Sequence, residues 1–164
     1  MNTINCSCGC KKSCCTGCCN SCQFNPCAVT CQPTFTREYG YVYTTTAQTI
    51  AADEAVEFSA NGILSPGISH TAGTGTIAVE TTGVYLVEFY ANSTAEDEFT
   101  LYQNSEPVTG ASFASQATGA NIGKVIISAQ KGDVITLVNT GAAEVALEAD
   151  GGAVNAAVTA ERLF

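Results

Sequence analysis

All ten cysteines of this chain lie within its first 31 residues, and residues 32–164 contain none. Eight of them fall in the segment CSCGCKKSCCTGCCNSC, residues 6–22. A short segment with so few large apolar side chains cannot offset the entropy cost of its own ordering by burial, so it needs cross-links or another protein surface on which to pack. The remaining residues must build a core without sulfur, and they are numerous enough for one domain. We therefore predict a cysteine-rich N-terminal arm, residues 1–32, and a head, residues 33–164.

The two parts carry opposite charge. Residues 1–32 contain Lys11 and Lys12 and no acid, so the arm has a net charge of +2. The head holds all fifteen acidic residues against four basic ones, which gives −11. An acidic domain without a basic stripe repels phosphate backbones and anionic lipid. We expect no nucleic acid and no membrane as partner, and we expect attraction between the arm of one copy and the head of another.

The start of the sequence, MNTINCSCGC, has neither a basic n-region nor an apolar h-region, and no run of 18 or more apolar residues occurs. Sec export and a membrane span are therefore not expected. Dense cysteine, however, is typical of an oxidising compartment or of a metal site. Synthesis in a cytosol followed by oxidation after release reconciles these observations.

The head has the composition of a β-protein. Five segments are rich in Val, Ile, Thr, Tyr and Phe and are separated by Gly, Asn, Asp and Pro: YGYVYTTT (39–46), TGVYLVEFYAN (82–92), EFTLYQNSEPV (98–108), GKVIISAQKGDVITLVNTG (123–141) and EVALEADGGAVNAAVTAERLF (144–164). No helical 3.6-residue stripe competes with them. The spacing of the turns predicts an all-β jelly-roll sandwich of about 8–10 antiparallel strands, preceded by an irregular arm.

Alternation within two segments predicts which side chains face the core. One side of residues 84–90 is expected to be buried and the other half-covered; the first comprises Tyr85, Val87 and Phe89, the second Val84, Leu86, Glu88 and Tyr90. The alternating Tyr39, Tyr41 and Tyr43 offer an aromatic face for a core or a subunit interface. The last forty residues are expected to form a meander that turns at QKGD, NTGA and ADGG.

Candidate catalytic and ligand motifs are weak. The only histidine, His70, lies in the Gly- and Ser-rich SPGISHTAGTG, without a serine or cysteine placed as in a known catalytic motif, and we expect a loop residue. The segment GANIGKV (119–125) is one residue short of a phosphate-binding loop and has Val125 where Ser or Thr would bind magnesium. The acidic run AEDEF (95–99) lacks the spacing and glycine of a calcium loop, so a solvated hairpin tip is expected. We expect no enzymatic activity.

Several motifs of the head resemble one family in their order along the chain. ETTGVYLVEFYAN, FTLYQNSEPVTGASF, ISAQKGDVITLVNTG and AAVTAERL resemble the trimeric jelly-roll heads of the complement and tumour-necrosis-factor superfamily. They are most similar to the C-terminal domain of BclA-type spore-surface glycoproteins, over residues 39–164. The resemblance implies a homotrimer with a role in architecture or display, without catalysis. It departs from the family in one respect, because no Gly-X-Y collagen repeat precedes the head.

The arm combines Cys-x-Cys spacing, two adjacent pairs and two Cys-x-x-Cys units. We favour disulfide cross-linking between chains, since adjacent cysteines rarely bridge each other and instead direct their sulfurs apart. Three arms gathered in one trimer would bring many thiols together. The predicted cross-linking residues are Cys6, Cys8, Cys10, Cys14, Cys15, Cys18, Cys19, Cys22, Cys27 and Cys31.

Two other interpretations of the arm remain open. A zinc, copper(I) or iron–sulfur centre could be held by several thiolates from a short segment; the candidates are Cys14, Cys15, Cys18, Cys19 and Cys22. The adjacent pairs fit a simple four-ligand site poorly, so we expect no cofactor. A flexible, partly oxidised tail is the third interpretation.

These arguments predict a structural subunit of a bacterial spore-surface layer (exosporium) or endospore appendage. The head would trimerise, and the arm would link trimer to trimer into a fibre, with other spore-surface proteins as further partners. The resemblance implies localisation at the spore surface, after synthesis in the mother-cell cytosol without a signal peptide. Two alternative functions are a metal- or cluster-binding filament and a soluble trimeric head that displays a ligand-binding surface.

Overall fold

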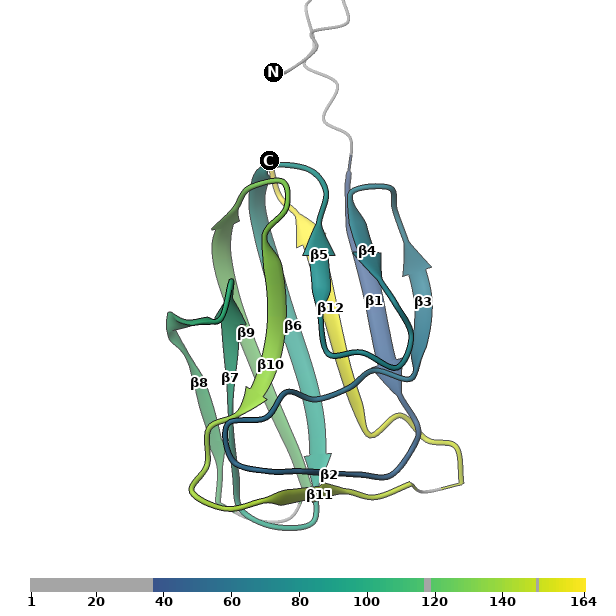
Figure 1. Cartoon of the computed structure of the whole chain (residues 1–164), viewed down its shortest axis with the longest axis vertical. Coiled ribbons are helices and arrows are strands. Elements are labelled where there is room, and N and C mark those ends of the chain that lie inside the picture. The colour runs from purple at the N-terminus through teal and green to yellow at the C-terminus, as the bar shows by residue number, and fades with distance from the viewer. Residues whose placement is uncertain (1–36, 117–118, 150) are drawn as a thin grey trace, which may run out of the picture. The chain divides into compact units, whose positions relative to one another are not determined.

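Strand-forming residues alternate in and out of a core along most of the head. The computed structural model describes residues 37–116, 119–149 and 151–164, in which the chain forms strands and no helix (Figure 1). The strands are β1 (Tyr39–Thr44), β2 (Gln48–Ile50), β3 (Ala60–Leu64), β4 (Ile68–His70), β5 (Ile77–Val79), β6 (Gly83–Ser93), β7 (Asp97–Gln103), β8 (Glu106–Ser115), β9 (Gly119–Ala129), β10 (Val134–Asn139), β11 (Val145–Leu147) and β12 (Ala156–Arg162). The cysteines of the arm lie outside the described residues.

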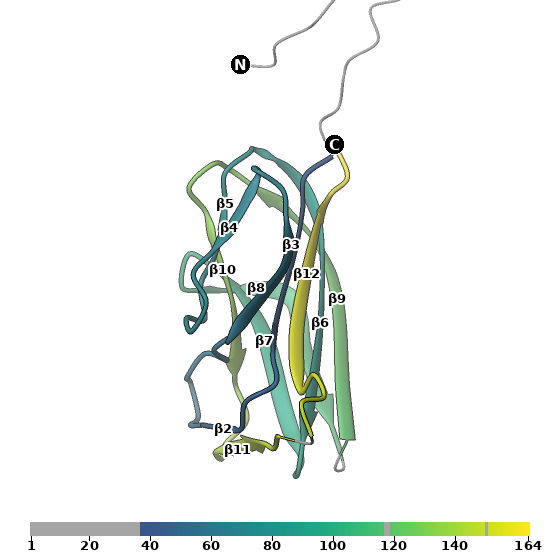
Figure 2. The same ribbon diagram turned by 90° about the vertical axis from the view of Figure 1, so that its right-hand side faces the viewer.

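The strands form two five-stranded sheets that pack face to face (Figure 2). The first sheet has the order β3-β1-β12-β6-β9 and the second the order β4-β5-β10-β7-β8, and all pairings are antiparallel. A two-stranded sheet, β11-β2, crosses one end of the sandwich (Figure 1). The predicted all-β sandwich is confirmed. The twelve described strands exceed the expected number because several are only three residues long.

The predicted meander of the last forty residues is wrong, although its turns are in the expected places. Successive strands do not pair with each other: β9 pairs with β6, β10 with β7 and β5, β11 with β2, and β12 with β1 and β6. The chain passes from one sheet to the other at each of these turns. Turn residues show where a strand ends but do not determine which sheet the next strand joins.

Aromatic side chains from both sheets meet in the core. Phe89 of β6 contacts Phe113 of β8 and Phe99 of β7 edge-on, with ring centroids 5.6 and 6.4 Å apart. A glycine makes room for this cluster, because a Cβ at Gly123 of β9 would lie 2.1 Å from Phe89 Cε1 and 2.5 Å from Phe113 Cδ2. The first and second sheets are therefore joined through rings that only a glycine at position 123 can accommodate.

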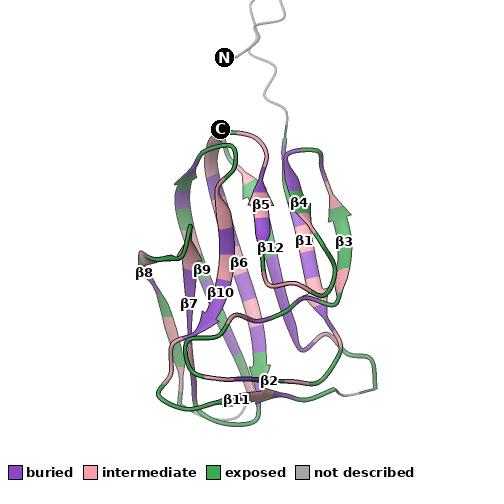
Figure 3. Cartoon of the chain, viewed as in Figure 1, coloured by how far each residue is buried: buried purple, intermediate pink, exposed green. Residues whose placement is uncertain are grey.

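The predicted alternation in β6 is confirmed. Tyr85 and Val87 are fully buried and Phe89 is 1% exposed, while the intervening side chains are half-buried; these are Val84, Leu86, Glu88 and Tyr90. The same pattern appears as alternating bands along the first sheet (Figure 3). In the part of the chain that the structure describes, no helix is long and apolar enough to cross a membrane.

Candidate interaction face

The outer face of the first sheet carries large apolar side chains on three of its strands. We name this surface the apolar face and define it by seven residues from β1, β6 and β9, namely Tyr39, Tyr41, Tyr43, Leu86, Tyr90, Ile122 and Ile126. They lie on one side of the sheet because the residues between them point into the core, among them Val42 of β1, Val87 of β6 and Ile127 of β9.

The pairing register sets these side chains in rows across the sheet. Two apolar rows flank a polar one: Tyr43, Ala157, Tyr90 and Ile122; then Tyr41, Thr159, Glu88 and Lys124; then Tyr39, Glu161, Leu86 and Ile126. Side chains directly opposite each other on neighbouring strands are close enough to pack. The seven residues thus form two apolar rows that Tyr41 connects at one side of the polar row, and Glu161 interrupts the third row.

The apolar face is exposed to an unusual degree for side chains of this size. Ile122 and Ile126 are 60% and 61% exposed, and Tyr39 is 44% exposed. Within the described residues, every large apolar side chain that is exposed belongs to the first sheet or directly follows β12; the remaining three are Ile63, Leu163 and Phe164. Contiguous exposed apolar surface on one side of a domain marks a site of protein association.

One ion pair crosses the polar row. Lys124 Nζ lies 2.7 Å from a Glu88 carboxylate oxygen, and both side chains are exposed, by 58% and 46%. An exposed pair of this kind contributes little to stability because water screens it. The pair neutralises Lys124 in the polar row, so burial of the adjacent apolar rows would not leave the charge of Lys124 without a partner.

Two tyrosines of the apolar face stack on each other. The rings of Tyr41 and Tyr43 lie 5.4 Å apart between centroids, with an angle of 20° between their planes. Partial burial raises the pKa of the Tyr41 hydroxyl above its ordinary value of 10.0, and the nearby Tyr43 hydroxyl raises it further. Gly62 of β3 packs over the Tyr41 ring, because a Cβ there would lie 2.5 Å from Tyr41 Cδ1.

The outer face of the second sheet has a different character. Most side chains on the outward side of its strands are small or polar, including Ser69, Ala78, Ser112 and Thr136, although Tyr102 and Val134 also lie there, half-buried. A sandwich with one polar and one apolar outer face can keep the polar face hydrated while it associates through the apolar face. The most exposed large apolar side chains on the strands are therefore those of the first sheet.

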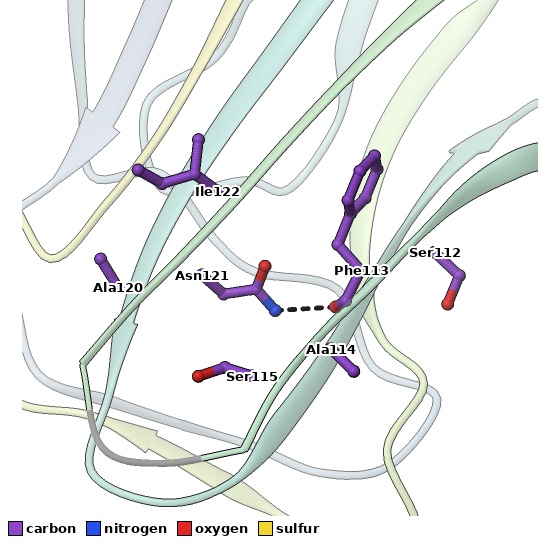
Figure 4. A pocket seen from close by; sticks show the side chains of 7 residues that line it. All are labelled: Ser112, Phe113, Ala114, Ser115, Ala120, Asn121 and Ile122. Atoms are coloured by element: carbon purple, nitrogen blue, oxygen red, sulfur yellow. Dashed lines mark hydrogen bonds between the residues drawn. The ribbon is translucent and has the colours of Figure 1, made fainter.

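A shallow hollow of about 520 Å³ lies at the edge of the sandwich between β8 and β9 (Figure 4). Its lining consists of Ser112, Phe113, Ala114, Ser115, Ala120, Asn121 and Ile122. The Asn121 side-chain amide donates to the Phe113 carbonyl oxygen at 2.7 Å and to an Asp97 carboxylate oxygen at 2.6 Å. The amide therefore holds the two edge strands together, and the hollow continues through Ile122 onto the apolar face.

His70 has a structural position. It is the last residue of β4 and does not lie in a loop as expected. One ring nitrogen bonds to the side-chain oxygen of Asn61, the other lies 3.0 Å from the Thr74 carbonyl oxygen, and the ring packs edge-on against Phe58. Both nitrogens of the ring are thus occupied by contacts that join β3, β4 and the loop after β4.

The acidic run 95–99 is not the tip of a hairpin as expected, because β6 and β7 on either side of it belong to different sheets. Ala95 and Glu96 are exposed, but Asp97 begins β7, is 6% exposed, and accepts hydrogen bonds from Ser93 and Asn121. Sequence alone did not show these partners, because Asn121 is distant along the chain. Among the described residues, no three His, Cys, Asp or Glu side chains are grouped as metal ligands would be.

The segment that resembles a phosphate-binding loop, residues 119–125, lies within strand β9. Its two apparent motif residues have other roles there. Gly123 makes room for Phe89 and Phe113, and Lys124 pairs with Glu88 across the strands. Core packing and cross-strand pairing explain both residues.

Sequence analysis identified the tyrosines of β1 but missed the rest of the apolar face. Ile122 and Ile126 alternate with small residues in a Gly- and Ala-containing segment, and Leu86 and Tyr90 were expected only to be half-covered. The alternation of these residues could have suggested an outward side, but the β6–β9 pairing was needed to bring them together. The predicted cross-linking and metal-binding cysteines all lie outside the described residues.

Residues 40–164 match the family model described as the BclA C-terminal domain. No curated protein matches the chain significantly. The globular domain of zebrafish complement 1qA protein is similar over 77% of this chain and 98% of its own, with 16% identity and a TM-score of 0.62. The structure of Eiger TNF from S. frugiperda is similar over 78% of this chain and 92% of its own, with 13% identity and a TM-score of 0.55. Murine APRIL at pH 8.0 is similar over 78% of this chain and 100% of its own, with 11% identity and a TM-score of 0.56. At these identities the three likenesses show a shared fold.

The raised pKa of Tyr41 predicts a loss of stability in alkali. The folded state holds the Tyr41 proton to higher pH than the unfolded state, so its contribution is complete below the ordinary value of 10.0 and is lost as pH rises through the folded pKa. Above pH 10.0, the denaturation midpoint of Tyr41→Phe should therefore fall less steeply with pH than that of the wild-type protein. Chemical denaturation from pH 8 to 12 measures this, with the neutral-pH difference between the two proteins as the reference. Parallel pH profiles would contradict the assignment.

Proposed function

Because the chain belongs to the family of the BclA C-terminal domain, we propose that it is a structural subunit of a bacterial spore-surface layer or appendage, in which heads trimerise and arms link trimer to trimer. The family match covers residues 40–164 and leaves the arm outside it. The observation that carries the proposal is the apolar face, which lies on one outer side of a domain that contains no cysteine. Association of heads and linkage by arms are therefore assigned to separate parts of the chain.

The apolar face supports association of heads with each other. Full burial of an isoleucine side chain contributes about 1.5–3 kcal/mol, and both Ile122 and Ile126 are more than half exposed in the single chain. Three copies around a common axis can each cover part of the face of a neighbour, and such a ring closes without leaving a face open. The polar outer faces of the second sheets then point to solvent. The family resemblance implies the same homotrimer.

The arm supplies the connection between trimers in this proposal. A contact from the arm of one trimer to the head of the next does not close, so it repeats into a filament. The charge of +2 on the arm and −11 on the head favours the approach of the two, although salt screens this attraction. Pro26 and Pro33 restrict the backbone around the last cysteines and suit a semi-rigid connector. Because residues 33–164 contain no cysteine, disulfides can form only between arms, so they join chains covalently where arms from neighbouring chains meet.

The first prediction from the proposed function concerns the trimer. We expect residues 33–164 alone to form trimers, and Ile126→Glu to yield folded monomers because the interface would have to bury an unpaired carboxylate. Thr136→Glu is the matched control, since it places the same charge on the outer face of the second sheet. Light scattering at micromolar concentration measures the mass, and circular dichroism checks the fold. A monomeric wild-type fragment, or equal behaviour of the two variants, would refute the assigned interface.

The second prediction concerns the bonds between arms. The full-length protein should remain oligomeric in hot detergent and dissociate when a reductant is added, because bonds between chains survive denaturation of the heads. Non-reducing and reducing gels measure this directly. Dissociation by a chelator alone, together with bound metal in elemental analysis, would favour the metal-binding filament instead.

The third prediction concerns the filament. Deletion of residues 1–31 should leave isolated trimers, whereas replacement of all ten cysteines by serine should give filaments that are fragile and insensitive to reductant, or none. Negative-stain electron microscopy distinguishes these states. Long filaments of the deleted protein would show that heads stack without the arm.

A further inference from the structure

Glu38 and Tyr39, where the chain enters β1, are hydrogen-bonded to the neighbouring elements on both sides. The Glu38 carbonyl oxygen accepts a hydrogen bond from the Arg162 N–H at 2.7 Å, at the end of β12. On the other side, Tyr39 donates its N–H to Ser65 Oγ at 2.9 Å and accepts from the Ser65 N–H at 2.8 Å. Ser65 lies in the turn between β3 and β4. The chain is therefore fixed to two neighbouring elements as soon as it enters the head.

The Glu38 side chain adds a second attachment. Its carboxylate is buried, with the residue 7% exposed, and one oxygen accepts hydrogen bonds from Ser65 Oγ at 2.6 Å and from the Gly67 N–H at 2.8 Å. Hydrogen bonds to a carboxylate are stronger than those between neutral groups. Position 67 must be glycine for this contact, because a Cβ there would lie 2.3 Å from Glu38 Cγ.

The same turn is tied to the second sheet. The Gly67 carbonyl oxygen accepts a hydrogen bond from the Glu80 N–H at 2.8 Å, and Glu80 directly follows β5. Ile68 begins β4, which pairs with β5 in that sheet. Through this turn, Glu38, which directly precedes β1, is connected to both layers of the sandwich, so a force on Glu38 is shared between them.

The position of β1 determines how it responds to tension. It lies between β3 and β12 and is antiparallel to both, with β12 paired along all six residues from Tyr39 to Thr44. Tyr39 is opposite Glu161, so the start of β1 and the C-terminus lie at the same end of the head (Figure 2). Hydrogen bonds between antiparallel strands run perpendicular to the strands. A pull along β1 therefore loads all pairs together, whereas a pull between the start of β1 and the C-terminus opens them one at a time.

We propose that the Glu38 carboxylate and β1 form a load-bearing anchor, which transmits tension from the arm into both sheets and resists it best when the opposite end of the head is held. The proposal rests on the proposed function, because a connector between stacked trimers is the part of the chain that carries tension. In this proposal Glu38 forms the mechanical attachment, and Gly67, which has no side chain, leaves the space that the Glu38 side chain occupies.

Single-molecule force spectroscopy on the full chain tests the anchor. One handle is an N-terminal tag, and the other is a biotin-acceptor peptide placed either after Phe164 or between Gly151 and Gly152, in the exposed turn before β12. That turn marks the opposite end, since β12 starts opposite Thr44. A reductant keeps the arm cysteines as thiols. We expect a several-fold higher unfolding force with the handle in the turn than with the handle at the C-terminus.

Glu38→Gln should lower the force measured with the handle in the turn, because the amide keeps the shape of the side chain but forms weaker hydrogen bonds with its two donors. Glu106→Gln is the matched control, an exposed acid at the start of β8, and should leave the force unchanged. Equal forces in the two pulling geometries, or equal effects of the two variants, would overturn the proposal. The comparison of geometries needs no variant, so it holds even if the Glu38 variant fails to fold. It also needs no filament, and thus its failure is distinct from failure of the proposed function.

Discussion

The contact of Phe89 with Phe99 and Phe113 is the interaction on which the rest of the structure depends. It joins the inner faces of the two sheets without any cysteine, and it fixes the side of β6 that points inward. Because side chains alternate along a strand, the inward direction of Phe89 sends Glu88 and Tyr90 to the outer face. The core contact therefore also creates the apolar face. A shift of one residue in the register would bury the polar side chains and expose the rings.

Parts of this arrangement follow from local sequence and parts do not. The alternation in β6 predicted both the strand and its buried side, whereas the alternation in β1 predicted the strand but left open whether its tyrosines face the core. The strands between residues 48 and 79 escaped prediction, because they are short and contain Gly, Ser and Ala among few strand-forming residues. The meander was wrong and the apolar face was incomplete for a common reason: both depend on pairings between strands that are distant in sequence. Gly123 shows the same limit, since its role depends on two phenylalanines from other strands.

The proposed function relies on two kinds of interaction. In it, the apolar face of the head associates noncovalently into a closed ring, while disulfides between arm cysteines link the chains covalently. Between them lies Glu38, whose buried carboxylate ties the beginning of β1 to a turn shared by both sheets. The proposed mechanical anchor thus lies within the residues that the structure describes. The proposal thus places assembly, covalent linkage and attachment in different residues, which can be substituted separately.

The proposed function depends on trimeric heads that are joined end to end into a fibre. Electron microscopy of the full-length protein, purified without reductant, can show this in class averages along and across any fibre. We expect heads with three-fold symmetry that repeat at a constant spacing along one axis, with the first sheet of each copy facing that axis. Isolated single heads, or fibres in which the second sheets face the axis, would contradict it.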